Sequence, residues 1–196
     1  MLPPSVTPTD LPSSYCTRII HTSVNTKMKS KLHCLSFSPL KPYLFSGSES
    51  GNLTRWSAST FIYDKAEQGH ASAVRAMAWN RAGDWMLTGD RLGQVRYWQS
   101  NMRPQEEFKA HDDVVRGISF SPTDSRFCTA SDDGSVRVWD FWERAPERKM
   151  DTDLRGHGAQ VTCVGWHPHM ALIASGSRDN SVILWDPKAG KAAHTM

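Results

Sequence analysis

Short runs of alternating apolar and polar residues recur along the chain. One run is Val95–Trp98 and another is Val136–Trp139, each with an arginine between apolar residues. The turn-forming residues Ser-Asp-Asp-Gly stand at 131–134, directly before the second run. No segment has the apolar spacing of three and four residues that is typical of a long amphipathic helix. The alternation and the turns therefore predict short antiparallel strands and an all-β protein.

Large aromatic residues indicate that these strands belong to a repeated unit. Four tryptophans each follow another large aromatic residue by 19 positions, in the pairs Phe37 and Trp56, Trp79 and Trp98, Phe120 and Trp139, and Trp166 and Trp185. Nine positions before the first aromatic residue stand Met28, His70, His111 and His157 in turn. These positions lie 41 to 46 residues apart, and the length varies only after each tryptophan. The spacing predicts a rigid unit that is repeated and joined by variable loops.

The residues at fixed places in the unit resemble those of the WD40 family. Gly-His stands at 69–70 and 156–157, and Trp-Asp stands at 139–140 and 185–186. The resemblance covers about residues 28–196 and implies a β-propeller with blades at about 28–69, 70–110, 111–156 and 157–196. Residues 23–196 would form the propeller, and the proline- and hydroxyl-rich residues 1–22 an extended N-terminal arm.

Four blades leave the closure of the ring open. The commonest WD40 ring has seven blades, and an open arc of four would leave strand edges unpaired. Either the ring closes with four blades, or the chain is part of a larger protein. We expect the second, with the four blades forming part of a seven-bladed ring.

The family resemblance also implies a structural role for the repeated polar residues. In WD40 blades a histidine, a strand hydroxyl, a turn aspartate and the tryptophan indole form a chain of hydrogen bonds that satisfies each buried polar group. The third and fourth units have the full set, which comprises His111, Thr129, Asp133 and Trp139, and His157, Ser175, Asp179 and Trp185. The second unit has Leu92 at the aspartate position. The last two blades are therefore predicted to be the more stable.

Composition and local patterns do not indicate an enzyme or a membrane protein. The 196 residues are 39% hydrophobic and carry a net charge of +3, which is typical of a protein with a real core. No nucleophile elbow, phosphate loop or metalloprotease pattern is present, and no stretch has the roughly 20 apolar residues of a membrane span. The pair His167 and His169 flanks a proline in a turn without an evident third ligand. We expect no enzyme activity, metal, cofactor or small-molecule substrate.

Several segments have a more specific resemblance, to the WD-repeat subunits of the cleavage and polyadenylation specificity complex. The most informative are Tyr-Trp-Gln-Ser-Asn-Met at 97–102 and Trp-Met-Leu-Thr at 85–88, because the WD40 consensus does not dictate them. This resemblance implies a nuclear scaffold that docks other subunits of that complex and helps recognise the AAUAAA signal in pre-mRNA.

An RNA role makes cations and aromatic faces the candidate contacts. The candidate residues are Lys27, Lys29, Lys31, Phe61, Tyr63, Arg75 and Arg116. The three lysines alternate just before the first blade, so an extended chain would place them on one side. The resemblance implies signal contacts specifically for Lys27 and Tyr63. The alternative function is a WD40 protein-interaction adaptor, such as a ubiquitin-ligase or chromatin platform, without RNA contact.

Overall fold

The computed structural model describes residues 30–60, 62–141 and 150–196, and the regular elements of these residues are all β-strands. The strands form four separate antiparallel sheets of four strands each. The first sheet contains β1 (Leu32–Phe37), β2 (Tyr43–Ser48), β3 (Asn52–Ser57) and β4 (Tyr63–Gln68). The second contains β5 (Val74–Trp79), β6 (Trp85–Asp90), β7 (Gln94–Gln99) and β8 (Pro104–Lys109).

The other two sheets have the same strand order. The third contains β9 (Val115–Phe120), β10 (Arg126–Ser131), β11 (Ser135–Asp140) and β12 (Met150–Arg155). The fourth contains β13 (Val161–Trp166), β14 (Ile173–Ser177), β15 (Val182–Asp186) and β16 (Lys191–Thr195). In every sheet each strand pairs with the next along the chain, as in a propeller blade. The all-β propeller architecture predicted from the repeats is thus confirmed.

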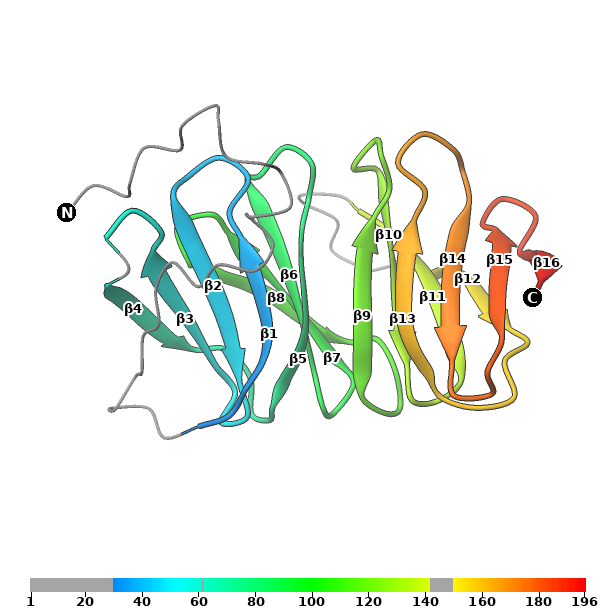
Figure 1. The fold of residues 1–196 in the computed structure, drawn as a ribbon, viewed down its shortest axis with the longest axis horizontal. Helices are drawn as coiled ribbons and strands as arrows, with labels where there is room; N and C mark the ends of the chain where they lie inside the picture. The colour runs from blue at the N-terminus through cyan, green and yellow to red at the C-terminus, as the bar shows by residue number, and fades with distance from the viewer. Residues whose placement is uncertain (1–29, 61, 142–149) are drawn as a thin grey trace, which may run out of the picture.

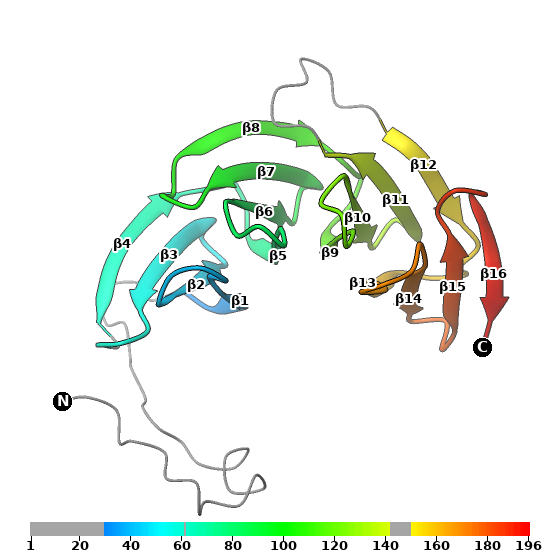
Figure 2. The same ribbon diagram turned by 90° about the horizontal axis from the view of Figure 1, so that it is seen from above.

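The four blades lie side by side in an arc (Figure 2). The first strands of the blades, β1, β5, β9 and β13, line the inside of the arc, and the fourth strands line the outside. Each inner strand packs beside the inner strand of the next blade. The predicted N-terminal arm, residues 1–22, lies outside the described residues, and the completion of a seven-bladed ring stays a prediction.

A tight turn between the second and third strands brings neighbouring blades together. Gly93 has a φ of +81°, and a Cβ atom at this position would lie 2.1 Å from the carbonyl oxygen of His111 in the next blade. The His111 N–H donates to the Gly93 carbonyl over 3.1 Å. Gly51 and His70 make the same contact between the first and second blades. Only glycine fits this approach at these two turns. At Gly134, the equivalent residue of the third blade, a Cβ atom would lie 3.5 Å from the Ala159 carbonyl oxygen, so the contact there is looser.

The hydrophobic core consists of three clusters, one between each pair of adjacent blades. Phe45, Met86 and Trp98 are central to the cluster between the first and second blades. The cluster between the second and third blades is rich in aromatic residues, which include Tyr97, Phe127, Trp139 and Phe141. The third cluster, between the third and fourth blades, contains Val138, Leu154, Ile173 and Trp185. Each blade therefore buries its apolar faces against its neighbours, as a repeat architecture requires.

The inner strands all run in the same direction, from the lower to the upper side of Figure 1. We call the side where they begin the lower rim and the side where they end the upper rim. The upper rim carries the repeated aromatic residues Phe37, Trp79, Phe120 and Trp166. Register places Tyr63 on the same side, because Phe37 pairs with Leu44, Leu44 with Trp56, and Trp56 with Tyr63. Lys31 precedes β1 and lies at the lower rim.

Candidate functional site

Hydrogen bonds join the four predicted network residues of the third blade. His111 and Thr129 are fully buried, and their Nε2 and Oγ1 atoms lie 2.7 Å apart. The Trp139 indole N–H donates to the same Oγ1 over 2.9 Å. His111 Nδ1 lies 2.9 Å from Asp133 Oδ2. When the Nδ1–H donates to Asp133 and the Thr129 hydroxyl donates to Nε2, every buried polar group of these four side chains has a partner.

The fourth blade has the same arrangement. His157 Nε2 lies 2.7 Å from Ser175 Oγ, and the Trp185 indole N–H donates to that oxygen over 2.8 Å. His157 Nδ1 lies 3.2 Å from Asp179 Oδ2. Asp179 also accepts the backbone N–H of Gly158 over 2.7 Å. The turn aspartate therefore holds both the imidazole and the chain beside it.

The aspartates of these networks have lowered pKa values. Burial alone would raise the pKa of Asp133, but hydrogen bonds from His111 and Ser135 lower it well below its ordinary value. Hydrogen bonds from Ser181, from the Gly158 N–H and from His157 likewise lower the pKa of Asp179. Both carboxylates are therefore ionised acceptors at neutral pH, which fits a structural role.

The second blade has a turn aspartate that the sequence pattern missed. Leu92 occupies the expected position, but Asp90 lies two residues earlier and is buried. Asp90 Oδ1 accepts the N–H groups of Leu92 over 2.9 Å and Gln94 over 2.8 Å. His70 Nε2 lies 2.7 Å from Thr88 Oγ1, which also accepts the Trp98 indole N–H. The signal in the sequence is an acidic residue three positions before the turn glycine Gly93. A comparison of the repeats at fixed positions overlooks it.

The first blade has a shorter set within the described residues. The Trp56 indole N–H donates to Ser46 Oγ over 3.0 Å. Ser48, at the position of Asp90, accepts the N–H of Asn52 with its hydroxyl over 3.1 Å. Met28, which takes the histidine position in the sequence, lies outside the described residues. The hydroxyl and indole pair is thus common to all four blades.

The structure does not bring the described RNA candidates together in one patch. Lys27, Lys29 and Phe61 lie outside the described residues. Lys31 is exposed at the lower rim, whereas Tyr63 is 47% exposed at the upper rim. The Tyr63 ring contacts Trp56 edge to face, with centroids 6.0 Å apart. A six-residue strand separates the two positions by roughly 20 Å, so one base cannot contact both.

Arg75 and Arg116 lie on inner strands at the lower rim, on the same side as Lys31. Arg75 Nη1 lies 3.3 Å from His33 Nδ1, and burial together with the Arg75 charge lowers the pKa of His33. Arg116 donates two hydrogen bonds to Asp132, over 2.9 and 2.7 Å. The Arg116 charge is therefore largely balanced within its own blade, and Arg75 is the more available cation.

The described residues contain no group of three or more His, Cys, Asp or Glu side chains that is arranged to hold a metal ion. His167 Nδ1 accepts the N–H groups of His169 and Met170, over 3.1 and 3.0 Å, so this imidazole closes a turn. Within the same described ranges, no helix has the length and apolar character needed to cross a bilayer.

Two cysteines at equivalent positions differ in burial. The sequence places Cys34 and Cys163 three residues before the repeated aromatic residue, where a buried slot for a small side chain is expected. Cys34 is partly buried and lies 3.8 Å from the Val74 carbonyl of the next blade, and burial raises its pKa to about 11. Cys163 is exposed, so the prediction is wrong for this residue. The slot is buried or half-buried in the three blades whose inner strand packs beside a following one.

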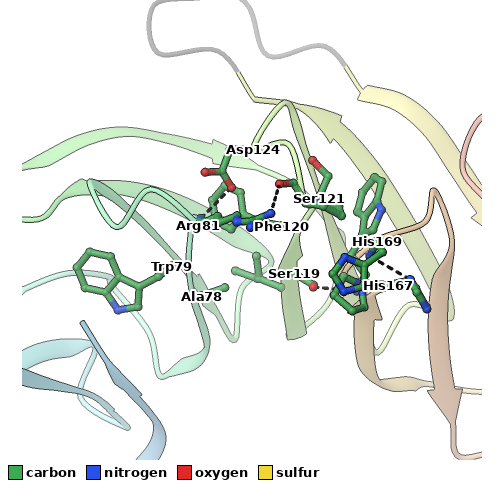
Figure 3. A pocket seen from close by; sticks show the side chains of 13 residues that line it. Ala78, Trp79, Arg81, Ser119, Phe120, Ser121, Asp124, His167 and His169 are labelled. Carbon is green, nitrogen blue, oxygen red and sulfur yellow. Dashed lines mark hydrogen bonds between the residues drawn. The ribbon is translucent and has the colours of Figure 1, made fainter. Parts of the chain in front are cut away.

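A pocket of about 400 Å³ opens at the upper rim between the ends of β5, β9 and β13. It lies between three turns that are far apart in the sequence. Figure 3 shows Trp79 on one side, His167 and His169 on the other, and Ala78 and Ser119 between them. Asp124 joins two of these turns by accepting the N–H groups of Arg81 and Ala82, over 2.8 and 2.9 Å. Sequence reasoning missed this pocket because no single repeat contains it.

Comparison with known proteins agrees with the repeats seen in the structure. The WD40 family, described as "WD domain, G-beta repeat", matches residues 17–57, 63–99, 102–140 and 148–186. The last three matches each begin with the outer strand of one blade and end with the third strand of the next. A sequence repeat therefore spans two blades and links them covalently.

Individual relatives are also similar over much of the chain. Polyadenylation factor subunit 2 of Neurospora crassa is 37% identical over 196 residues, which cover 100% of this chain and 29% of the relative. Polyadenylation factor subunit 2 of Candida albicans is 37% identical over 134 residues, which cover 68% of this chain and 24% of the relative. WD-40 repeat-containing protein MSI4 of Arabidopsis thaliana is 28% identical over 154 residues, 78% of this chain and 28% of the relative. The chain spans less than a third of these relatives.

Four WD40 matches, four antiparallel blades and a shared chain of hydroxyl and indole hydrogen bonds all agree. The chain belongs to the WD40-repeat family.

Proposed function

We propose that this chain is part of a non-catalytic scaffold subunit of the nuclear pre-mRNA cleavage and polyadenylation machinery. The observation that carries the proposal is the 37% identity to a polyadenylation factor subunit along the whole chain. Three relatives with other names, among them MSI4, are 24–29% identical. Because the propeller fold alone does not determine function, this difference in similarity is the basis of the assignment.

In this function the rims dock other subunits of the cleavage and polyadenylation specificity complex, and the chain helps hold the AAUAAA signal of the pre-mRNA. Tyr63 supports a contact with RNA bases, because its ring is exposed and is held edge to face by Trp56. Aromatic faces of this kind stack on single-stranded bases. Lys31 and Arg75 at the lower rim support a separate phosphate contact.

A titration of RNA against the full-length protein with its polyadenylation partners tests the proposal. RNA with an intact AAUAAA hexamer should bind more tightly than RNA with a mutated hexamer. Tyr63→Ala should weaken binding of the intact hexamer by about 1–3 kcal/mol, the usual contribution of one stacked base. Tyr63→Phe retains the ring and is the matched control.

The outcomes separate the candidate functions. Lys31→Ala should weaken binding to both RNAs alike and reduce the dependence on salt, as expected for a phosphate contact. If the assembled complex shows no preference for the intact hexamer, the signal-reading role is wrong. Binding that is also indifferent to Tyr63 and Lys31 would favour a protein-interaction adaptor without RNA contact.

A further inference from the structure

The pocket at the upper rim, between the ends of β5, β9 and β13, has aromatic walls. Trp79, Phe120 and Trp166 line it, each from the last position of an inner strand. Its volume of about 400 Å³ lies within the usual range for ligand pockets, about 300–1,000 Å³. Each of these three residues is only partly buried, which leaves part of its side chain for a ligand with a flat π-face.

Hydrogen-bond donors predominate among the polar groups of the pocket. Ser119 Oγ accepts the Trp166 backbone N–H over 2.9 Å, which leaves its own hydroxyl hydrogen for another acceptor. His167 Nδ1 accepts two backbone N–H groups, so the ring carries its proton on Nε2. The carboxylate of Asp124 is occupied by the N–H groups of Arg81 and Ala82. The pocket therefore favours a ligand rich in acceptors.

The charge at the opening of the pocket also favours a ligand rich in acceptors. The Arg81 side chain is exposed. Its guanidinium donates to the Pro122 carbonyl over 3.4 Å, and this neutral partner leaves its charge in place. His169 is exposed at the same opening and lies 6.3 Å from the His167 ring, centroid to centroid. A cation beside an aromatic, donor-rich pocket suits a flat base joined to a phosphate.

We propose that this pocket binds one unstacked nucleotide of single-stranded RNA, with the base against the aromatic walls and the phosphate beside Arg81. The inference rests on the proposed RNA role and assigns part of the RNA contact to pocket residues that the sequence candidates did not include. The pocket and Tyr63 lie on the same rim, so one RNA strand that crosses the rim can contact both. Lys31, on the other rim, takes no part in this contact.

The test is fluorescence anisotropy of the full-length protein with labelled single-stranded RNA that contains AAUAAA and flanking nucleotides on both sides. The double variant Arg81→Ala/His169→Ala changes only exposed pocket residues and should weaken binding about five-fold or more. The double variant Arg155→Ala/His194→Ala removes an exposed arginine and an exposed histidine from outer strands. As the matched control, it should bind as tightly as the wild type.

A second pair of variants examines stacking. Trp166→Phe retains an aromatic face and should keep most of the affinity, whereas Trp166→Leu, with a side chain of similar volume to Phe, should lose about 5- to 100-fold. Circular dichroism of both variants checks that the blades are folded. Equal affinities for the folded Phe and Leu variants would overturn the pocket as a stacking site.

The remaining outcomes distinguish the pocket from the general RNA role. If the wild type binds AAUAAA selectively and the pocket variants bind equally well, the pocket proposal is wrong while the proposed function stands. If the pocket variants retain RNA but lose a protein subunit of the complex, the pocket is a peptide site and the proposal is likewise overturned. If the assembled wild type binds no RNA, the RNA role and the pocket proposal fail together.

Discussion

A single hydroxyl group in the third blade serves two buried side chains. Thr129 Oγ1 accepts the Trp139 indole N–H and contacts His111 Nε2, and all three residues are at least 94% buried. Thr129→Val keeps the shape but removes both bonds and leaves a buried indole N–H without an acceptor. We expect the free energy of unfolding to fall by about 1–3 kcal/mol, measured by urea denaturation at neutral pH.

Thr162→Val provides the control for this substitution. Thr162 also lies in a strand, but it is exposed and its hydroxyl donates only to the Gly176 carbonyl over 3.1 Å. Its replacement should change the free energy of unfolding by less than about 0.5 kcal/mol. Similar losses for Thr129→Val and Thr162→Val would mean that the buried network adds little stability.

The lowered pKa of Asp133 makes the third blade sensitive to acid. Its folded pKa lies below the ordinary value of 3.8 because hydrogen bonds from His111 and Ser135 outweigh the opposing effect of burial. Folding therefore favours the ionised carboxylate. The resulting stability is present above about pH 4 and is lost as the pH falls below that value. Asp133→Asn should be less stable than the wild type at neutral pH and should lose less stability on acidification.

Urea midpoints of the wild type and Asp133→Asn, measured at about pH 7, 5 and 3.5, test this expectation. The difference between the two proteins should narrow at the lowest pH. Asp112→Asn is the control and should follow the wild type, because Asp112 is an exposed residue next to His111 in the loop before β9. A difference between wild type and Asp133→Asn that stays constant across this range would contradict the assignment.

The sequence predicted the network residues that stand at fixed positions of the repeat. It did not predict a network residue whose role is taken by another residue nearby. The WD40 resemblance implies the hydroxyl and indole pairs, which recur ten residues apart because the third strand pairs with the second in every blade. Asp90 could not be predicted in this way. Its side chain reaches forward to the N–H groups of Leu92 and Gln94, so a carboxylate two positions away supports the same turn.

The blades differ in how completely they are enclosed, and this changes the expected order of their stability. Hydrogen-bond sets alone predicted the last two blades to be the more stable. In the structure the second and third blades have neighbours on both sides, and β6 and β10 are largely buried. In the fourth blade β13 is largely exposed or half-buried, since Val161 alone is buried in it.

Native-state hydrogen exchange of the 196-residue chain should therefore be slowest in β6 and β10 and faster in β14. The physical reason is that opening a strand enclosed by two neighbours exposes more apolar surface. Mass spectrometry of peptic peptides from each blade gives the exchange rates. Slower exchange in β14 than in β6 would show that the polar network, rather than enclosure, determines local stability.

The positions of the strands relative to one another explain why the RNA candidates were only partly predictable. Alternation and spacing gave the strands, but the side of the blade on which a residue lies depends on strand direction and pairing. Lys31 precedes the inner strand, and Tyr63 begins the outer strand after three reversals of the chain. They therefore lie at opposite rims, although both belong to the first blade. The upper-rim pocket depends on three blades, so no pattern within one repeat predicts it.

At the scale of the whole arc, aromatic residues couple the two halves of the molecule. Phe141 follows the third strand of the third blade and stacks on Tyr97 of the second blade, with centroids 5.9 Å apart and planes 12° apart. It also contacts Trp85 of the second blade edge to face, at 6.3 Å. Because each blade contacts only its neighbours, cooperativity between the first two and last two blades depends on this interface.

Phe141→Ala should therefore reduce both the stability and the cooperativity of unfolding. Removal of a buried phenyl ring costs about 3–5 kcal/mol. Here the loss falls on the contact that joins two pairs of blades, each of which keeps its own cluster. Urea unfolding followed by tryptophan fluorescence and by far-ultraviolet circular dichroism should coincide for the wild type and separate for Phe141→Ala.

Phe37→Ala is the control for loss of a ring without loss of the interface, because Phe37 is 67% exposed. Its two transitions should coincide and shift little. If the Phe141→Ala transitions also coincide and merely shift to lower urea, the remaining contacts between β5, β6 and β9 are sufficient to couple the blades. The arc would then unfold as one unit because of its inner strands, and the aromatic cluster would contribute stability without being needed for cooperativity.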